Sequence, residues 1–326
     1  MNSVQNRFGA LAERLERQVL GQPQLVERLL IALLANGHLL VEGAPGLAKT
    51  RAIRQLGAHL EASFQRIQFT PDLLPADLTG TEVFRPQDSS FVFHKGPLFH
   101  NLILADEINR APAKVQSALL EAMAERQITV GQTSYLLNDP FLVMATQNPI
   151  EQEGTYPLPE AQLDRFLLHV RIDYPRLEIE RQILHLARNE AMAEANGETQ
   201  QPPDFCLLSG HELRLARREV LELYLADNLQ EYLLQLVLAT RDPKPWGTEL
   251  VGWIAYGASP RASIALDRCA RARAWLAGRD YVTPEDIQQL LGDVLRHRLL
   301  LSYEAEAEGI TPDRVIAELL ARVPVP

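Results

Sequence analysis

The stretch His38-Leu-Leu-Val-Glu-Gly43-Ala-Pro-Gly-Leu-Ala-Lys49-Thr50 decides the fold expected for this chain. Its apolar run, 38–42, predicts a buried strand, and a helix is expected from Leu47 to about Ala62. A glycine-bearing loop that ends in Lys-Thr, between a strand and a helix, is the setting that a phosphate-binding loop requires. A glycine turn with an incidental lysine is the alternative for this segment taken alone.

Each residue type in this loop has a physical reason. Glycines let the backbone bend so that successive amides point at phosphate oxygens, and the following helix adds the positive end of its dipole. Lys49 is expected to pair with the β- and γ-phosphates, and the Thr50 hydroxyl to ligate Mg²⁺. Ala48 stands where the usual pattern has glycine, which is tolerable if this residue has helical dihedral angles. The residues expected to bind nucleotide here are Gly43, Ala44, Pro45, Gly46, Leu47, Ala48, Lys49 and Thr50.

Two adjacent acids follow another apolar run. Residues 102–105 predict a buried strand, which ends in Asp106 and Glu107. A strand buried on both faces has no reason to end in two carboxylates unless a cation is nearby. Asp106 is expected to hold Mg²⁺, directly or through water, and Glu107 to orient and deprotonate the water that attacks the γ-phosphate. A solvated strand end is the alternative for this pair taken alone.

An amide side chain follows a third apolar run. Residues 141–146 predict a strand, and Gln147-Asn148-Pro149 comes directly after it. From a neighbouring strand, Asn148 would be able to reach the attacking water or the γ-phosphate. A turn-forming Asn before Pro is the alternative.

The pattern of elements changes about halfway along the chain. Further strands are expected at 66–70 and 166–170, and helices between the strands imply a parallel sheet with helices on both faces. From Arg176 onward no convincing strand remains. The expected domains are therefore an α/β core at 1–172 and a helical domain at 173–326. Three helices of the second half are expected to start at a capping residue followed by proline, at Ser259-Pro260, Thr283-Pro284 and Thr311-Pro312.

Composition narrows the class of protein. The 326 residues are 46% hydrophobic and 23% charged, which suits an ordinary soluble protein with room for two domains. The formal net charge of −10 argues against a protein whose main task is coating nucleic acid. Cys206 and Cys269 form no metal-ligand or disulfide pattern, so a reducing, cytoplasmic compartment is expected. No signal-peptide profile opens the chain, and no apolar run approaches the roughly 20 residues of a membrane helix.

In order and spacing, these motifs resemble an AAA+ ATPase, and in detail its MoxR branch. That branch commonly carries alanine before the lysine, as at Ala48. The resemblance covers nearly the whole chain and implies a P-loop AAA+ core with a parallel sheet, followed by an all-α lid. The matching segments are Gly-Ala-Pro-Gly-Leu-Ala-Lys-Thr (43–50), Ala-Asp-Glu-Ile-Asn-Arg-Ala-Pro (105–112), Ala-Thr-Gln-Asn-Pro (145–149), Leu-Pro-Glu-Ala-Gln-Leu-Asp-Arg-Phe (158–166) and Ser-Pro-Arg (259–261).

The resemblance also implies roles for further residues. Arg165 matches the arginine finger, which reaches the γ-phosphate bound by the adjacent subunit. Pairing with Asp164 or Glu160 on its own short helix is the alternative for Arg165. Arg261 matches the second sensor of the lid, and an anionic ligand would explain a cation in the first turn of a helix, where it opposes the dipole. The segment that usually lies beside the adenine is matched by Gly21 and Gln22.

Residues 69–99 depart from a minimal ATPase core. The segments Val83-Phe-Arg85 and Phe91-Val-Phe-His94 flank a turn-like segment at 86–90, which predicts a β-hairpin. This hairpin is similar to the helix-2 insert of the MoxR, magnesium-chelatase and replicative-helicase groups. A second hairpin is expected at 128–136. Such hairpins usually face the ring pore or a partner, and decoration of the sheet edge is the alternative.

The function implied by the resemblance is ATP hydrolysis, with ATP and Mg²⁺ as cofactors, in a ring expected to be hexameric. The expected role is that of a chaperone-like remodeller or maturation factor, acting on proteins with a von Willebrand factor A domain. A DNA-acting motor is one alternative, but acids are abundant and nucleic acid is not the expected partner. A nucleotide-gated binding module is the other, and an intact Glu107 argues against it. The basic residues that favour a DNA motor are Arg268, Arg271, Arg273 and Arg279.

Overall fold

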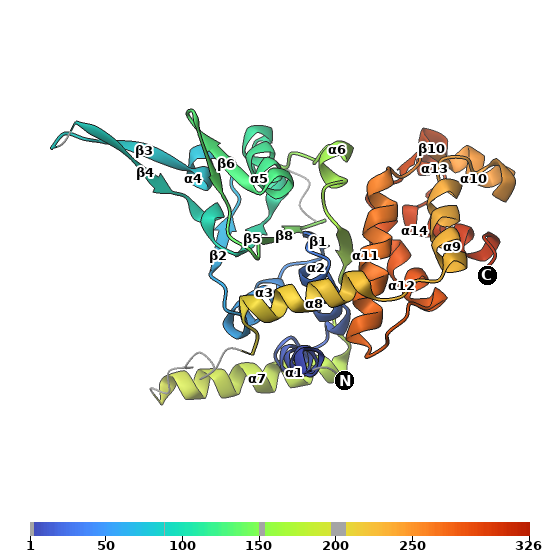
Figure 1. Ribbon diagram of the computed structural model, residues 1–326, viewed down its shortest axis with the longest axis horizontal. Coiled ribbons are helices and arrows are strands. Elements are labelled where there is room, and N and C mark those ends of the chain that lie inside the picture. Colours follow the sequence, from blue (N-terminus) through green and yellow to red (C-terminus); the bar gives the residue numbers. More distant parts are fainter. Residues whose placement is uncertain (1–2, 88, 150–153, 197–206) are drawn as a thin grey trace.

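The computed structural model describes residues 3–87, 89–149, 154–196 and 207–326. At its centre lies a five-stranded sheet of order β2-β5-β8-β1-β9, in which all neighbouring strands are parallel (Figure 1). The predicted parallel sheet is thereby confirmed, and each strand begins and ends within two residues of its predicted bounds. The strands are β1 (Leu39–Glu42), β2 (Phe64–Gln68), β5 (Leu102–Asp106), β8 (Leu142–Gln147) and β9 (Leu168–Arg171).

Both faces of this sheet are buried. Successive side chains of a strand point to opposite faces, so Leu39 and Val41 join one apolar cluster while Leu40 joins the other. The first cluster includes residues of α1 (Ser3–Gln18), α2 (Pro23–Leu34) and α3 (Lys49–His59). The second includes residues of α5 (Ala113–Glu125). Burial on both faces explains why the central strands β1, β5 and β8 are nearly continuous apolar runs, whereas the edge strand β2 carries polar residues.

The strand order determines where the functional segments meet. Because the strands are parallel, all their carboxyl ends lie at the same edge of the sheet. In the sheet, β8 lies between β1 and β5. The loops that follow these three strands therefore converge, and they carry Gly43–Thr50, Glu107 and Asn148. Ligands of open parallel sheets bind at such an edge.

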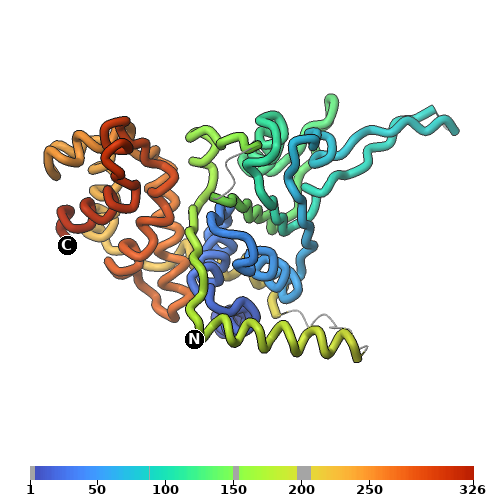
Figure 2. The backbone as a smooth tube through the Cα atoms, turned by 180° about the vertical axis from the view of Figure 1, so that it is seen from behind, coloured from blue at the N-terminus to red at the C-terminus, as the bar shows by residue number. Residues whose placement is uncertain are grey.

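Two β-hairpins extend from the sheet-bearing half, as predicted. The first pairs β3 (Gly80–Arg85) with β4 (Ser90–Lys95) and projects away from the body (Figures 1 and 2). It lies between the short helices α4 (Pro75–Thr79) and η1 (Pro97–Phe99). At the base of this hairpin the backbones of β3 and β4 lie very close together. A Cβ on Gly80, whose φ is 95°, would lie 2.2 Å from the His94 carbonyl oxygen. The second hairpin pairs β6 (Gln127–Val130) with β7 (Thr133–Leu136).

The second half of the chain is helical, as predicted, apart from one small sheet. The capped starts are confirmed: Ser259, Thr283 and Thr311 each stand directly before a helix that begins with proline. The expectation of no strand beyond Arg176 is wrong, because β10 (Ile254–Tyr256) pairs antiparallel with β11 (Leu300–Leu301). The helices are α7 (Leu177–Ala195), α8 (Gly210–Glu222), α9 (Asp227–Ala239), η3 (Lys244–Trp246), α10 (Thr248–Trp253), α11 (Pro260–Leu276), α12 (Pro284–Leu295), α13 (Tyr303–Ala307) and α14 (Pro312–Arg322).

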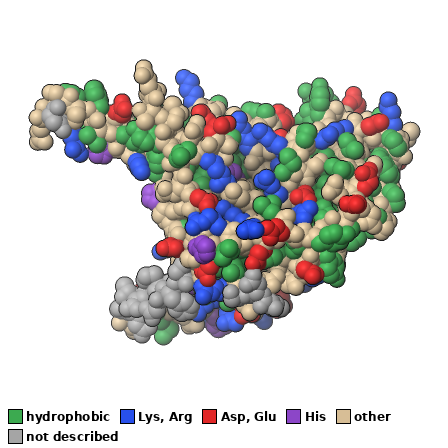
Figure 3. Space-filling view, in the orientation of Figure 1, with side chains coloured by type: hydrophobic (Ala, Val, Ile, Leu, Met, Phe, Trp, Pro, Cys, Tyr) green, Lys and Arg blue, Asp and Glu red, His purple; other side chains and the backbone are tan. Residues whose placement is uncertain are grey.

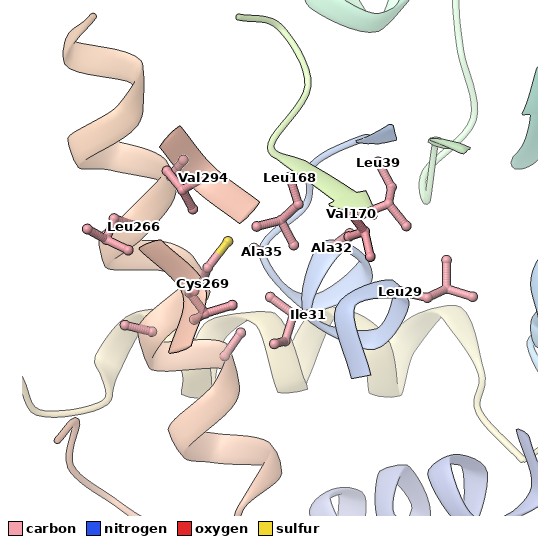
Figure 4. Packing of buried hydrophobic residues seen from close by; sticks show 14 of the residues in the cluster. Leu29, Ile31, Ala32, Ala35, Leu39, Leu168, Val170, Leu266, Cys269 and Val294 are labelled. Atoms are coloured by element: carbon pink, nitrogen blue, oxygen red, sulfur yellow. The ribbon is translucent and has the colours of Figure 1, made fainter. Parts of the chain in front are cut away.

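One apolar cluster runs from the sheet into the helical half. In it, Val170 of β9 and Ile31 of α2 share a core with Cys269 of α11 and Val294 of α12 (Figure 4). Cys269 is thus a buried packing residue, as predicted, whereas Cys206 and most of the expected polar loop at 196–204 lie outside the described residues. The division of the chain at residue 172 stays a prediction.

The helices α7 and α8 lie beside the sheet-bearing half, although they belong to the second half of the sequence. The helix α8 packs against α1 and α2, beside the sheet-bearing half (Figure 1). The helix α7 lies along the outside and has no buried side chain, and an ion pair between Glu190 and Arg51 joins it to α3.

Within the described residues, no helix combines the length and the apolar character needed to cross a membrane.

Candidate active site

A cleft of ≈ 390 Å³ lies at the carboxyl edge of the sheet, beside the loop that joins β1 to α3. It brings together the predicted phosphate loop, Asp106, Glu107 and Asn148. Arg51 and Arg66 also line it, although the sequence assigned no site role to either. The full lining is Pro45, Gly46, Leu47, Ala48, Lys49, Thr50, Arg51, Arg66, Asp106, Glu107 and Asn148.

The phosphate loop differs from expectation at Ala48. Its φ of 58° and ψ of 16° lie in the left-handed region, so the condition under which alanine carries no strain here is not met. In this region a Cβ approaches the following carbonyl oxygen, at a cost of roughly 1–2 kcal/mol. Gly46, with a φ of 83°, turns the same loop without that cost. Strain of this kind is found where the surrounding structure holds a loop ready for a ligand.

Lys49 points back over the loop that precedes it. Its Nζ donates a hydrogen bond to the carbonyl oxygen of Gly43 at 2.7 Å. Burial lowers the pKa of Lys49 from its ordinary value, while the charges of Asp106 and Glu107 act in the opposite direction. A partly buried ammonium between a backbone loop and two carboxylates is suited to an anionic ligand in the cleft.

Both carboxylate oxygens of Asp106 have partners. The Thr146 hydroxyl of β8 donates to Oδ1 at 2.6 Å. Arg66 of β2 donates to Oδ2 twice, from Nη2 at 2.6 Å and from Nε at 3.1 Å. The Thr146 oxygen also accepts a bond from the backbone amide of Glu107 at 2.9 Å. Three neighbouring strands therefore fix the position of this carboxylate.

Glu107 is turned by an unusual backbone conformation. Its φ of 58° and ψ of 51° are left-handed, which is uncommon for a residue with a side chain. Its Oε2 accepts bonds from Gln68 Nε2 at 2.7 Å and from Arg110 Nη1 at 3.1 Å. The backbone strain and the two donors orient a carboxylate that is 23% exposed toward the cleft.

Asn148 lies one residue beyond β8 and is 6% exposed. It lines the cleft together with Lys49 and Glu107. The predicted meeting of these three segments is therefore observed in the structure, and the chemical role of each residue stays a prediction.

The residues of this cleft fit a nucleotide with Mg²⁺. The loop after β1 leads into the amino end of α3, whose free amides and dipole favour phosphate. The Thr50 hydroxyl and the Asp106 carboxylate are oxygen donors, which Mg²⁺ prefers. Gly43 cannot carry a side chain, because a Cβ there would lie 2.5 Å from Ile172 Cγ1. Gly43 thus lets the loop pack against the core, while the helix amino end and the oxygen donors fit phosphate and its metal.

The predicted adenine segment lies near the base of the same loop. The Gln22 side chain donates to the carbonyl oxygen of Asp173 at 2.9 Å. Gly21, with a φ of 79°, leaves no room for a Cβ against Ile179. The neighbouring Ile172 is the residue that packs against Gly43. Gln22 therefore contacts the residue next to Ile172, and neither Gly21 nor Gln22 lines the cleft.

Arg165 and Arg261 line a different pocket, of ≈ 360 Å³, together with Arg126, Arg268 and Arg298. Lys and Arg side chains gather over this part of the face shown in Figure 3, around α5, α6 (Glu160–Leu163) and α11. The structure therefore brings the predicted finger and the predicted second sensor together, but not to the phosphate loop of their own chain.

The bonds of Arg165 differ from the expected alternative. Its Nη1 donates to the carbonyl oxygen of Leu120 at 2.6 Å. Among the described residues, no ion pair joins Arg165 to Asp164 or Glu160. Asp164 instead pairs with Arg298, at 2.8 Å from Nε, and more distantly with Arg261, at 3.5 Å.

The contacts of Arg261 bear on the anionic ligand expected at the start of α11. The sequence predicts such a ligand because the charge of Arg261 opposes the helix dipole there. The Asp164 carboxylate and the Ser259 hydroxyl, which donates to it at 2.9 Å, lie at that helix start. An acid of the chain itself therefore offsets the charge of Arg261, and the dipole alone no longer requires a ligand there.

Sequence reasoning missed Arg66, Gln68, Thr146 and Arg298. The signal for the first two was present, since polar residues at alternate positions of a parallel strand are unusual. Thr146 was seen only as a strand residue, because its bonds to Asp106 and Glu107 depend on strand order. Nothing in the sequence links Arg298 to Asp164 across 134 residues.

Comparison with known proteins agrees with this geometry. The family model described as ATPase family associated with various cellular activities (AAA) matches residues 38–168, and an AAA lid domain model matches residues 253–319. The Chaperone MoxR1 of Mycobacterium tuberculosis is 46% identical over 95% of this chain and 80% of that protein. The Bacillus subtilis protein YeaC, described as uncharacterized, is 43% identical over 98% of this chain and 95% of its own length.

A solved structure agrees as well. A Cytophaga hutchinsonii crystal structure, described as that of a candidate ATPase, superposes with a TM-score of 0.89 at 44% identity. It covers 99% of this chain and 96% of that one. The sheet order, the helical lid and the acid pair beside a phosphate loop are the features of an ATP-hydrolysing enzyme. The chain belongs to the MoxR family of AAA+ ATPases.

Proposed function

We propose that this chain hydrolyses Mg²⁺-bound ATP at the cleft beside Gly43–Thr50 and uses the energy to remodel protein partners. The observation that carries the hydrolytic site is the convergence of Lys49, Asp106, Glu107 and Asn148 on one cleft. A binding module alone would have no need of Glu107, a carboxylate that is oriented by strain and two donors.

Each residue has a distinct task in this proposal. The loop amides and Lys49 bind the phosphates and lower their negative charge. Thr50 and Asp106 would hold Mg²⁺, which supplies positive charge at the phosphates when it is bound. Glu107 takes a proton from the attacking water, and Asn148 helps to place that water. Gln22 and Gly21 are assigned to the adenine side, beyond the base of the loop.

Completion of the site by a neighbouring subunit is part of the proposal. Arg165, in the turn after α6, and Arg261, on α11, line one pocket that lies away from the phosphate loop of their own chain. From such a place an arginine would serve a nucleotide bound by another copy. A closed ring supplies that copy to every subunit, and six members is the proposed number.

A protein client is favoured over DNA. The Mycobacterium relative carries the name chaperone, and proteins with a von Willebrand factor A domain are the proposed partners. The arginines that favoured a DNA motor are largely neutralised by acids of the chain. Arg271 pairs with Asp267, while Arg273 and Arg279 both pair with Asp286. A cytoplasmic location is part of the same proposal, and the free thiol of Cys269 suits it.

ATP hydrolysis by the purified protein, measured with and without Mg²⁺, tests the proposed site. Lys49→Ala should abolish nucleotide binding and hydrolysis, while Lys114→Ala, at an exposed position of α5, should leave both unchanged. Parallel assays with single-stranded DNA and with a von Willebrand factor A domain protein compare the two kinds of partner. Stimulation by DNA alone would favour the motor, and unchanged hydrolysis by Lys49→Ala would refute the site.

A further inference from the structure

The oxygen of Asp106 that is not bonded to Thr146 is occupied by a cation of the chain itself. Arg66 places two donors on Oδ2, at 2.6 and 3.1 Å. The register of β2 against β5 fixes this contact, because Arg66 pairs with Leu104 and Gln68 pairs with Asp106 at the carboxyl edge. The guanidinium also lines the cleft. A permanently charged group thus lies against the carboxylate that is proposed to hold Mg²⁺.

The two oxygens of this carboxylate are not equivalent. Oδ1 accepts from the Thr146 hydroxyl, whose residue is 1% exposed and is fixed in the middle of the sheet. Oδ2 faces Arg66, whose side chain is 51% exposed and is less constrained by packing than Thr146. Magnesium requires short contacts in near-ideal octahedral geometry. A guanidinium that donates two bonds to Oδ2 seeks the same lone pairs and repels the metal.

We propose that Arg66 is a built-in competitor of Mg²⁺ for Oδ2 of Asp106. In this role Arg66 is a positioning residue that raises the Mg²⁺ concentration at which nucleotide binds tightly. It releases the carboxylate only when the metal and the nucleotide enter together. This inference rests on the proposed role of Asp106, and it adds a residue that controls the metal requirement of the site.

Arg66 has a second anchor when it leaves Asp106. Its Nη2 also donates to the Gln68 side-chain oxygen at 2.8 Å, and the Gln68 amide donates to Glu107 at 2.7 Å. The chain of contacts Asp106–Arg66–Gln68–Glu107 therefore joins the two acids of the site. Arg66 is therefore able to leave Oδ2 while its bond to Gln68, and the bond from Gln68 to Glu107, are kept.

Binding of a fluorescent, slowly hydrolysed ATP analogue during titration with MgCl₂ tests the proposal without relying on turnover. Arg66→Gln should lower the half-saturating Mg²⁺ concentration by about threefold to tenfold, the range expected for loss of a charge-assisted ion pair. Arg66→Lys should lie between this variant and the wild type. Arg54→Gln, at an exposed position of α3 outside the cleft, removes the same charge and should match the wild type.

The salt dependence separates contact from long-range repulsion. At an ionic strength of about 0.5 M the screening length falls to roughly 4 Å, so a difference due only to the overall field should vanish. A difference due to competition at Oδ2 should persist. Thermal unfolding of each variant establishes that it is folded.

The outcomes distinguish this inference from the proposed function. Wild-type protein that binds the analogue with Mg²⁺, together with an unchanged or raised half-saturating concentration for Arg66→Gln, overturns the competition alone. The same holds if Arg54→Gln shifts the titration as far as Arg66→Gln does. Wild-type protein that binds no analogue at any Mg²⁺ concentration overturns the proposed site and, with it, the competition.

Discussion

Arg298, three residues beyond the end of α12, places its Nε 2.8 Å from Oδ1 of Asp164, the residue immediately before Arg165. The Arg298 side chain is 2% exposed, and its Nη2 also donates to the carbonyl oxygen of Phe166 at 2.6 Å. Through these bonds the helical lid holds the turn that carries the proposed arginine finger. The position of that finger thus depends on the lid.

Arg298→Met should therefore destabilise the protein strongly. It leaves the Asp164 carboxylate without its principal partner, and breaking a buried pair in this way costs roughly 3–5 kcal/mol. Denaturant unfolding should show the loss, and Arg188→Met, at an exposed position of α7, serves as the matched control. Equal stability of the two variants would show that the Asp164 pair contributes nothing.

Ala48→Gly tests the strain in the phosphate loop. Relief of the left-handed conformation is worth roughly 1–2 kcal/mol, and the added freedom of glycine in the unfolded chain costs roughly 0.5–1 kcal/mol. The free energy of unfolding should therefore rise by up to about 1.5 kcal/mol. Ala52→Gly, inside α3, should instead lower it by about 1 kcal/mol. If both variants are destabilised alike, Ala48 is not strained.

Thr146→Val tests the hydroxyl that joins the two acids. Valine keeps the shape of the side chain but neither donates to Asp106 nor accepts from the Glu107 amide. The buried groups left unpaired should cost about 1–3 kcal/mol of unfolding free energy. Hydrolysis should fall as the acids lose their fixed positions, and Thr146→Ser should restore most of both properties. A valine variant with wild-type stability and turnover would contradict this role.

Glu107→Gln separates binding from hydrolysis. The amide can still accept from Gln68 and Arg110, so the cleft should keep its shape and its affinity for nucleotide. Because the amide is not basic, hydrolysis should fall by roughly 10²- to 10⁴-fold. Nucleotide binding by fluorescence and phosphate release measure the two effects, and Glu16→Gln, at an exposed position of α1, is the control. Unchanged turnover would remove Glu107 as the base.

The sheet and its functional edge were predictable because their determinants are local. An apolar run followed by glycines and Lys49, and another followed by Asp106, identify strands and the chemistry at their ends. Parallel pairing then brings those ends together. The left-handed dihedral angles of Ala48 could not be predicted, because the loop, held by its surroundings, overrides the preference of alanine.

Long-range contacts explain what was missed. The Arg66–Asp106 bond requires the register of β2 against β5, and the Arg298–Asp164 bond requires the docking of the lid. Neither is encoded in a nearby motif. The sequence likewise predicted Arg261 at a helix start but not its position beside Arg165, because that depends on how the helical half packs.

Arg165 is expected to act across the boundary between two subunits. Arg165 lines a pocket away from the phosphate loop of its own chain, so it should act on nucleotide held by Lys49 of a neighbour. Arg165→Ala and Lys49→Ala should each be inactive alone. When they are mixed under conditions of subunit exchange, about one interface in four joins an intact cleft to an intact finger, so hydrolysis should reappear.

A second mixture gives the matched control. Glu107→Gln and Lys49→Ala both damage the cleft, so no interface between them combines an intact cleft with an intact finger. That mixture should stay inactive at every ratio. Recovery in the first mixture but not in the second requires that Arg165 acts across the boundary. If neither mixture exceeds its components while native mass measurement shows mixed assemblies, the bond from Arg165 to the Leu120 carbonyl is a structural contact within one subunit.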